Sequence, residues 1–574
     1  MTCTLKWTMA LGLALALVAG GAFAAGGDMS LDRARAALAI NDGIAAEVRL
    51  REALKVGKGS ADVRALMGEA LLAQGDLVHA REWLTGGEFT PATRAEGFRM
   101  LGRLELREHS LPAAGRAFDL ALQSAPRDAR LWADIGRLRF AGGEQREAIE
   151  AADHALALAP QEPSALALRA ILIRSQYGLT ASLPWFEAAL AKAPDDPALL
   201  AEYAATLGDM GRAGAMLKAV RRLHKVAPND PHVFYLQAVL AARAGRDRLA
   251  RRILYRNKQT MRDVPGAILL TGVLELRAGN LEVAVGQFDR LLRLQPDNIH
   301  ARHLLARALA TSGDAAGVIA RFDGLARQAD AAPYLLTLVA RSFEELGQRD
   351  RAVPLLIRAA QPSRGGGVAL SVEAPSGVLA LRHADAPGRA ETTVSWVRAL
   401  LRDGRTGEAL AAAIMLRNAN PGAPDAHLML GDTALAAGRT ELALSAYQAA
   451  ARIRFGEAET VRLDAALRAL GREREANTVL LAQALQNPNA LLPVRMLANA
   501  EGRSRRWQQS AELLSWLGTR SGWRDPALLA DLAFARLQQG EENDARALAA
   551  KAFTLQPANP STGQIRAMTF ASAR

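Results

Sequence analysis

The sequence predicts an all-α protein built as a row of paired helices. Three observations predict it. A turn glycine recurs at intervals of 34 residues, prolines recur at the same interval, and the residues between them are apolar at helical spacing. Half of the chain is hydrophobic but only 5% is aromatic, which favours close helix packing over strands.

The segment from Leu131 to Pro160 shows one repeat unit. The residues expected on the packed faces of its two helices are Trp132, Ile135, Gly136 and Phe140 in the first helix and Ala148, Ala152, Ala155 and Leu156 in the second. Gly142 and Gly143 separate the two helices, and Pro160 ends the unit because proline cannot continue a helix. We expect Gly136 to let the two backbones approach closely.

The turn position can be followed through most of the chain. It is occupied by Gly75, Gly143, Gly178, Gly211, Gly245, Gly279, Gly313, Gly347, Gly404, Gly438, Gly471 and Gly540. Every step from Gly211 to Gly347 is 34 residues. The same spacing assigns Asn41, His109 and Arg505 to turns that lack a glycine.

A 34-residue helix–turn–helix period resembles the tetratricopeptide repeat (TPR), and the resemblance covers roughly residues 30 to 560. It rests on Trp132, Ile135-Gly136, Phe140, Ala148, Ala155 and Pro160 and on their equivalents in other units. The resemblance implies a right-handed superhelical solenoid of about 14–15 repeats. First helices are then expected to line a concave side and second helices a convex side.

The N-terminus is expected to be an export signal. Lys6 precedes an apolar run, and Ala22-Phe23-Ala24 has the small residues of a cleavage site, so residues 1–24 are read as a signal peptide. An uncleaved inner-membrane anchor is the alternative. We therefore expect a periplasmic or secreted protein, and Cys3, the single cysteine, would be removed with the signal.

The remaining chain divides into four parts. Residues 28–362 are expected to form an N-terminal block of repeats and residues 387–560 a C-terminal block. About 23 residues interrupt the period, so 363–386 is read as an insert. Its alternating Val368, Leu370 and Val372, followed by a turn and GVLALRH, predict either a β-hairpin or a loop. Residues 561–574 form a tail that either caps the last unit or stays disordered.

No catalytic or nucleotide-binding motif is present, so we expect neither enzymatic activity nor a cofactor. His300 and His303 lie three residues apart on one expected helix face, but no carboxylate sits at a matching spacing. We expect a polar pair there and no metal site.

The expected concave face carries arginines interleaved with aromatic residues. The register places on it Arg99, Arg103, Arg130, Arg137, His232, Tyr235, His303, Arg307, Tyr334, Arg341 and Arg398. Such a face suits an extended peptide, sugar rings or carboxylates, because arginine binds carboxylates through two N–H groups. A solvated face with no particular ligand is the alternative.

A second basic surface is expected on a convex helix. Arg248, Arg252 and Arg256 are four residues apart and share one helix face, where like charges repel. The formal net charge is +12. An acidic polysaccharide, an anionic membrane surface or an acidic protein is therefore an expected target, and nucleic acid is not expected for an exported protein.

These observations predict a non-catalytic scaffold in the periplasm. By analogy with exported TPR proteins, it is expected to bind protein partners in cell-envelope or exopolysaccharide assembly and export. The alternative is an exported chaperone or adaptor for outer-membrane or secreted proteins. Neither the partner nor the oligomeric state follows from the sequence.

Overall fold

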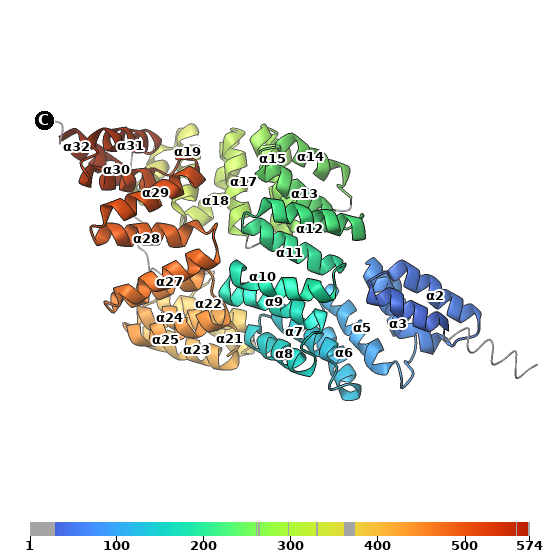
Figure 1. The fold of residues 1–574 in the computed structure, drawn as a ribbon. Coiled ribbons are helices and arrows are strands. Elements are labelled where there is room, and N and C mark those ends of the chain that lie inside the picture. The colour runs from blue at the N-terminus through green and yellow to red at the C-terminus, as the bar shows by residue number, and fades with distance from the viewer. Residues whose placement is uncertain are drawn as a thin grey trace, which may run out of the picture. The chain divides into compact units, whose positions relative to one another are not determined.

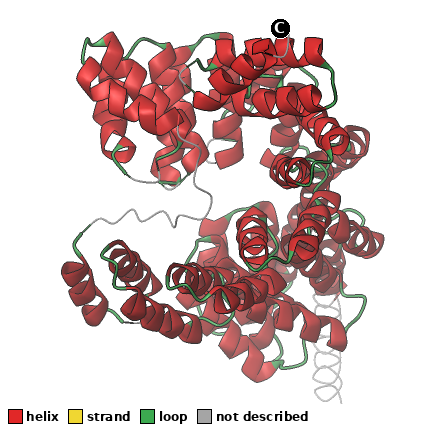
Figure 2. Ribbon diagram, turned by 90° about the vertical axis from the view of Figure 1, so that its left-hand side faces the viewer, coloured by secondary structure: helices red, strands yellow, loops and turns green. Residues whose placement is uncertain are grey.

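The computed structural model describes residues 29–571 except 260, 262–263, 297, 329–330, 361–373, 388 and 558. Within these residues the chain forms helices joined by short loops, and no strand occurs (Figure 2). The expected all-α class is confirmed. The proposed signal peptide lies outside the described residues.

The chain divides into two compact units. The N-terminal unit comprises residues 1–174 and 182–203, and the C-terminal unit comprises residues 175–181 and 204–574. After a helix at residues 29–39, the helices up to the boundary region are α2 (Gly43–Lys55), α3 (Ser60–Gln74), α4 (Leu77–Thr85), α5 (Arg94–Arg107), α6 (Leu111–Ser124), α7 (Ala129–Ala141), α8 (Gln145–Leu158), α9 (Pro163–Tyr177) and α10 (Leu179–Lys192). The next are α11 (Pro197–Asp209), α12 (Ala213–Val226), α13 (Pro231–Arg243), α14 (Asp247–Arg256), α15 (Pro265–Ala278), α16 (Leu281–Leu294), α17 (Ile299–Thr311), α18 (Ala315–Ala326), α19 (Pro333–Glu345) and α20 (Arg349–Ala360). The last are α21 (Ser376–Asp385), α22 (Ala390–Arg402), α23 (Thr406–Ala419), α24 (Pro424–Ala436), α25 (Thr440–Ile453), α26 (Glu457–Ala469), α27 (Glu473–Gln486), α28 (Leu491–Arg503), α29 (Trp507–Ser521), α30 (Pro526–Gln538), α31 (Glu542–Leu555) and α32 (Pro560–Ala571).

Each helix packs mainly against its neighbours in sequence, as expected for stacked pairs (Figure 1). The turn inside each pair holds one residue with positive φ, at every glycine that the spacing assigned. Asn41, His109 and Arg505 also have positive φ, between 57° and 60°. The turn positions assigned by counting are therefore confirmed, including the three without glycine.

A glycine on the first helix of several pairs receives a large side chain from the second. A Cβ on Gly102 would lie 2.3 Å from the Phe118 ring, and one on Gly272 would lie 2.5 Å from Phe288. Both phenylalanines are buried. At Gly136, a Cβ would lie 2.6 Å from the end of the Leu168 side chain and 3.3 Å from the backbone oxygen of Ala148, so the backbones of α7 and α8 do approach closely there.

The described part of the insert is not the β-hairpin that was one of the two structures predicted from the sequence. Residues 361–373, which contain the first arm of the expected hairpin, lie outside the described residues. The expected second arm, residues 377–383, belongs to helix α21, so a strand there is wrong. Leu379 is buried, and His383 stacks on Trp396 of α22 with ring centroids 4.9 Å apart. Packing on α22 therefore selects the helix.

The described part of the C-terminal tail, up to residue 571, forms a cap. Helix α32 packs on α30 and α31, with Ile565 buried against Leu529, Ala549 and their neighbours. The Arg566 guanidinium lies 4.4 Å from the centre of the Phe553 ring. Of the two readings of the tail, the cap is the one that the structure has.

Candidate functional site

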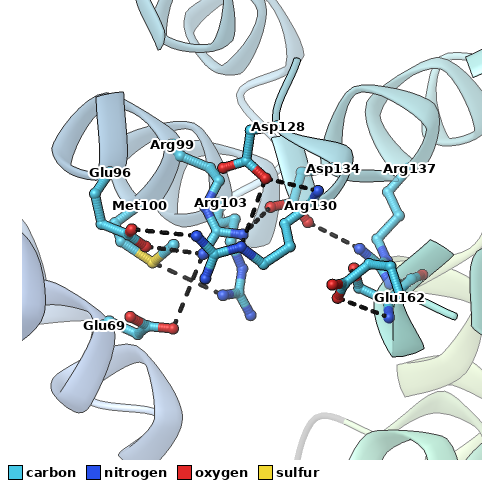
Figure 3. Close-up of polar contacts among 11 residues, drawn as sticks. Glu69, Glu96, Arg99, Met100, Arg103, Asp128, Arg130, Asp134, Arg137 and Glu162 are labelled. Carbon is cyan, nitrogen blue, oxygen red and sulfur yellow. Dashed lines mark hydrogen bonds and ion pairs between the residues drawn. The ribbon is translucent and has the colours of Figure 1, made fainter. Parts of the chain in front are cut away.

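Three successive first helices of the N-terminal unit bring charged residues together on one face. Helices α3, α5 and α7 contribute Glu69, Arg99, Arg103, Asp134 and Arg137, and the loop before α7 adds Asp128 (Figure 3). We call this surface the α3–α5–α7 face. Stacked repeats place equivalent positions of neighbouring first helices side by side, so the cluster follows from the repeat period.

Arg99 is the centre of this face and is only 5% exposed. Its guanidinium lies 2.9 Å from Glu96, 3.6 Å from Asp134 and 4.0 Å from Glu69. Burial alone would lower the pKa of Arg99, but these carboxylates outweigh it and raise that pKa. Arg99 is therefore a fixed buried cation that positions the surrounding acids, and its direct contact with a partner remains a prediction.

Arg130 and Arg137 are partly exposed and hold carboxylates at the edge of the same face. Arg130 lies 3.6 Å from Glu96 and 3.5 Å from Asp128. Arg137 donates to Asp134 at 2.8 Å and to the Ser164 carbonyl at 2.9 Å. These ion pairs fix the arginines in place before any ligand arrives.

Arg103 and Arg107 differ from the other arginines of the face. Among the described residues, neither has a carboxylate within ion-pair distance. Arg103 contacts the Met100 sulfur at 3.7 Å, and Arg107 donates to the Leu72 carbonyl at 2.5 Å. Burial, and then the charge of Arg103, lower the pKa of Arg107. Two like charges one helical turn apart thus lack a direct ion pair, although the charge of Glu69 acts on Arg103 and that of Asp134 acts on Arg107.

The carboxylates and Arg107 were missing from the predicted site. Glu69 and Glu96 occupy the same register as the predicted arginines, six and thirteen residues before the turns at Gly75 and His109. The prediction named arginines and aromatic residues at these positions and did not include the glutamates. Burial is the first cause that raises the pKa of Glu69, followed by the charge of Glu96. The spacing of Arg107, one turn after Arg103, was the signal for that residue.

The predicted residues of the C-terminal unit are more dispersed. His303 and Tyr334 make an edge-on ring contact with centroids 6.1 Å apart, and burial lowers the pKa of His303. The other predicted residues have separate surroundings. Tyr235 is half-buried against Gly266, and Arg307 and Arg398 are exposed. Arg341 pairs with Glu344 at 2.5 Å, and the His232 ring lies 2.8 Å from the Asp230 carboxylate. A binding role for these residues stays a prediction.

An apolar pocket lies elsewhere in the C-terminal unit, between α27, α28 and α29. Its volume is about 670 Å³. Leu481, Val494, Leu497, Leu513 and Trp516 form its apolar lining, and Glu501 and Glu512 lie at the polar part. Leu481 is 52% exposed, so an apolar side chain can reach it from solvent.

Comparison with protein families agrees with the helix pairs and their period. A family model described as tetratricopeptide repeat matches residues 269–334 and 394–458. The chain therefore contains tetratricopeptide repeats. This family forms protein-binding scaffolds, and the fold is generally non-catalytic. In the described residues, no group of three His, Cys, Asp or Glu side chains is placed to hold a metal ion, and no helix combines the length and apolarity of a membrane span.

Several solved structures are similar to this TPR protein at low identity. A TPR protein from Parabacteroides merdae is 18% identical over 44% of this chain and 99% of its own, with a TM-score of 0.32. PilF from Pseudomonas aeruginosa is 16% identical over 40% and 90%, with a TM-score of 0.28. YrrB, a TPR protein with an unusual peptide-binding site, is 20% identical over 33% and 96%, with a TM-score of 0.25. No curated protein matches the sequence.

Proposed function

We propose that this TPR protein is a non-catalytic periplasmic scaffold that captures an acidic segment of a protein partner on the α3–α5–α7 face. The partner belongs to cell-envelope or exopolysaccharide assembly and export. The basic composition and the expected signal peptide support an envelope location. The repeat family supports capture of protein rather than chemistry on a substrate.

The observation that carries the proposal is the pair Arg103 and Arg107. The neighbouring Arg99, Arg130 and Arg137 are engaged by carboxylates of the protein itself. Arg103 therefore offers a guanidinium that makes no direct ion pair among the described residues, beside a network that holds the surrounding side chains in place. A carboxylate from a partner can pair with Arg103 without breaking an existing ion pair.

The experiment compares two arginines of one repeat. Arg103 is on the first helix α5, and Arg116 is an exposed arginine on the second helix α6 with no acidic partner among the described residues. Binding of a labelled peptide rich in Asp and Glu is measured by fluorescence anisotropy. Arg103→Ala should weaken binding about tenfold or more, since a bond to a charged group contributes about 1.5–3 kcal/mol. Arg116→Ala should leave binding unchanged.

Two results would overturn the proposed site. Equal losses in both variants would show that net charge alone attracts the peptide. Unchanged binding in Arg103→Ala would remove the α3–α5–α7 face from the interaction. A neutral peptide of the same length completes the comparison, because it should bind neither the parent protein nor the variants.

The apolar pocket favours a second candidate function, an exported chaperone or adaptor. An unfolded outer-membrane protein offers apolar side chains that fit a cavity lined by Leu481, Leu513 and Trp516. A chaperone should suppress aggregation of such a client, and Leu481→Glu should remove that activity. A scaffold should retain binding to its acidic peptide in Leu481→Glu and show no suppression of aggregation.

A further inference from the structure

The outward faces of two second helices, α12 and α14, carry cations and no acids. The outward arc of α12 holds Lys218, Arg221, Arg222 and Lys225, and that of α14 holds Arg248, Arg251, Arg252 and Arg256. Both helices belong to the C-terminal unit, and both pack on α13 (Figure 1). We call these two arcs the α12–α14 face.

The repeat period aligns the two arcs. Lys218 and Arg252 are 34 residues apart, and so are Arg222 and Arg256. Residues at equivalent positions of neighbouring repeats point to the same side of a stack. The sequence alone indicated only the α14 arginines, and the structure extends the surface to a second helix.

Among the described residues, the fold leaves most of this charge without a carboxylate partner. Helix α12 contains no acidic residue, and the only one of α14, Asp247, lies 3.7 Å from Arg277 rather than on the outward arc. Arg251 lies 3.6 Å from Glu275. Among the described residues, no carboxylate pairs with Lys218, Arg221, Lys225, Arg248, Arg252 or Arg256. Like charges so close together are unfavourable unless an anionic partner covers them.

Apolar side chains lie exposed among these cations. Tyr255 of α14 is 81% exposed, and Leu249 and Leu217 are 39% and 38% exposed. At 100° per residue, Tyr255 lies between Arg248 and Arg251 around α14, and the two leucines lie at the margins of the arcs. Exposed aromatic and aliphatic groups within a basic helix face are typical of surfaces that sit in the headgroup region of a bilayer.

We propose that the α12–α14 face docks on an anionic phospholipid bilayer. The cations bind the lipid phosphates, while Tyr255, Leu249 and Leu217 enter the boundary between headgroups and acyl chains. A bilayer takes up both kinds of side chain. An acidic polysaccharide or a nucleic acid offers anions but no apolar phase for the leucines. This docking uses helices other than those of the α3–α5–α7 face and is independent of partner capture there.

The experiment is flotation of the full chain with phosphatidylcholine vesicles, with and without added phosphatidylglycerol. The parent protein should float only with the anionic vesicles, and salt should reverse it. The variant Lys218→Glu/Arg252→Glu/Arg256→Glu should lose affinity by about a hundredfold or more, since each basic residue near the surface contributes about 1 kcal/mol. The Arg103→Ala protein should float like the parent.

Two further variants make the result specific. Arg474, Arg503 and Arg524 are exposed arginines of the same unit with no acidic partner among the described residues. Reversing all three to Glu changes the net charge equally and should leave flotation intact. Leu249→Ser/Tyr255→Ser keeps every charge and should weaken retention on anionic vesicles several-fold.

Four results overturn the proposal. They are flotation with phosphatidylcholine alone, equal loss in the matched charge reversal, no effect of Leu249→Ser/Tyr255→Ser, and tighter binding to soluble DNA or alginate than to anionic vesicles. The first would assign binding to the apolar N-terminus, which all variants share. The last two would assign the face to a soluble polyanion.

Discussion

At the scale of single residues, each helix pair depends on one backbone position with positive φ. Gly279 adopts φ 81° and ψ 7° between α15 and α16, and a Cβ added there would meet no atom within 4 Å. Steric conflict with neighbouring atoms is therefore not the reason for glycine at position 279. The left-handed conformation itself disfavours a side chain, because the Cβ then approaches the following carbonyl oxygen.

This reasoning predicts opposite effects for two glycines of one repeat. Gly279→Ala should cost about 1 kcal/mol, through backbone strain alone. Gly286→Ala, inside α16 and equally open, should stabilise by about 0.5–1 kcal/mol, because glycine is a poor helix former. Amide hydrogen exchange across α15 and α16 reports both changes. Effects of the same sign would contradict the assignment of the turn.

Counting residues found the turns at Asn41, His109 and Arg505 without any glycine, since the repeat fixes the backbone there before the side chain matters. The partners of Arg99 could not be found in this way. Ion pairing depends on which side chains of neighbouring repeats meet, and Asp134 lies outside the register positions that were projected. Periodicity therefore predicts backbone placement better than side-chain pairing.

At the scale of elements, a pair of helices is joined by a side chain that fills the space above a glycine. A Cβ on Gly431 of α24 would lie 2.2 Å from the Tyr447 ring of α25. Tyr447 is buried, and its hydroxyl donates to Asp432 at 2.8 Å. Arg462 of α26 also binds Asp432, at 2.7 and 2.8 Å, so this contact links two successive pairs.

Gly431→Ala should therefore destabilise the protein by about 1–3 kcal/mol through overpacking. Adding Tyr447→Leu should recover part of this loss, because the smaller side chain removes the clash while Arg462 still binds Asp432. Urea unfolding followed by circular dichroism measures both. Additive losses in the double variant would show that the two positions do not share one space. Gly407→Ala, in open space on α23, is the control.

The insert shows where an element could not be predicted. GVLALRH is a short apolar run, and such a run fits a strand or a buried helix equally well. Its helical state follows from contacts with α22, made by Leu379 and by His383 on Trp396. Those contacts involve residues outside the run, so the local pattern carried no information about them.

At the scale of the whole molecule, the proposed periplasmic role depends on export. Residues 1–24 should be removed after Ala24, so that the mature chain begins at Ala25. Mass spectrometry of the protein recovered from a periplasmic fraction checks this directly. An intact N-terminus in the membrane fraction would indicate the uncleaved anchor instead. Full-length protein in the cytosol would contradict the proposed location.

Helix α32 has a consequence for self-association. Each internal repeat presents a stripe of alanine and leucine to the next, and α32 covers the corresponding stripe of α30 and α31 with Ile565. Without α32, the first helices of a second molecule could occupy that stripe. A head-to-tail contact that does not close into a ring propagates into open-ended fibres. We therefore expect α32, by covering this stripe, to oppose polymerisation.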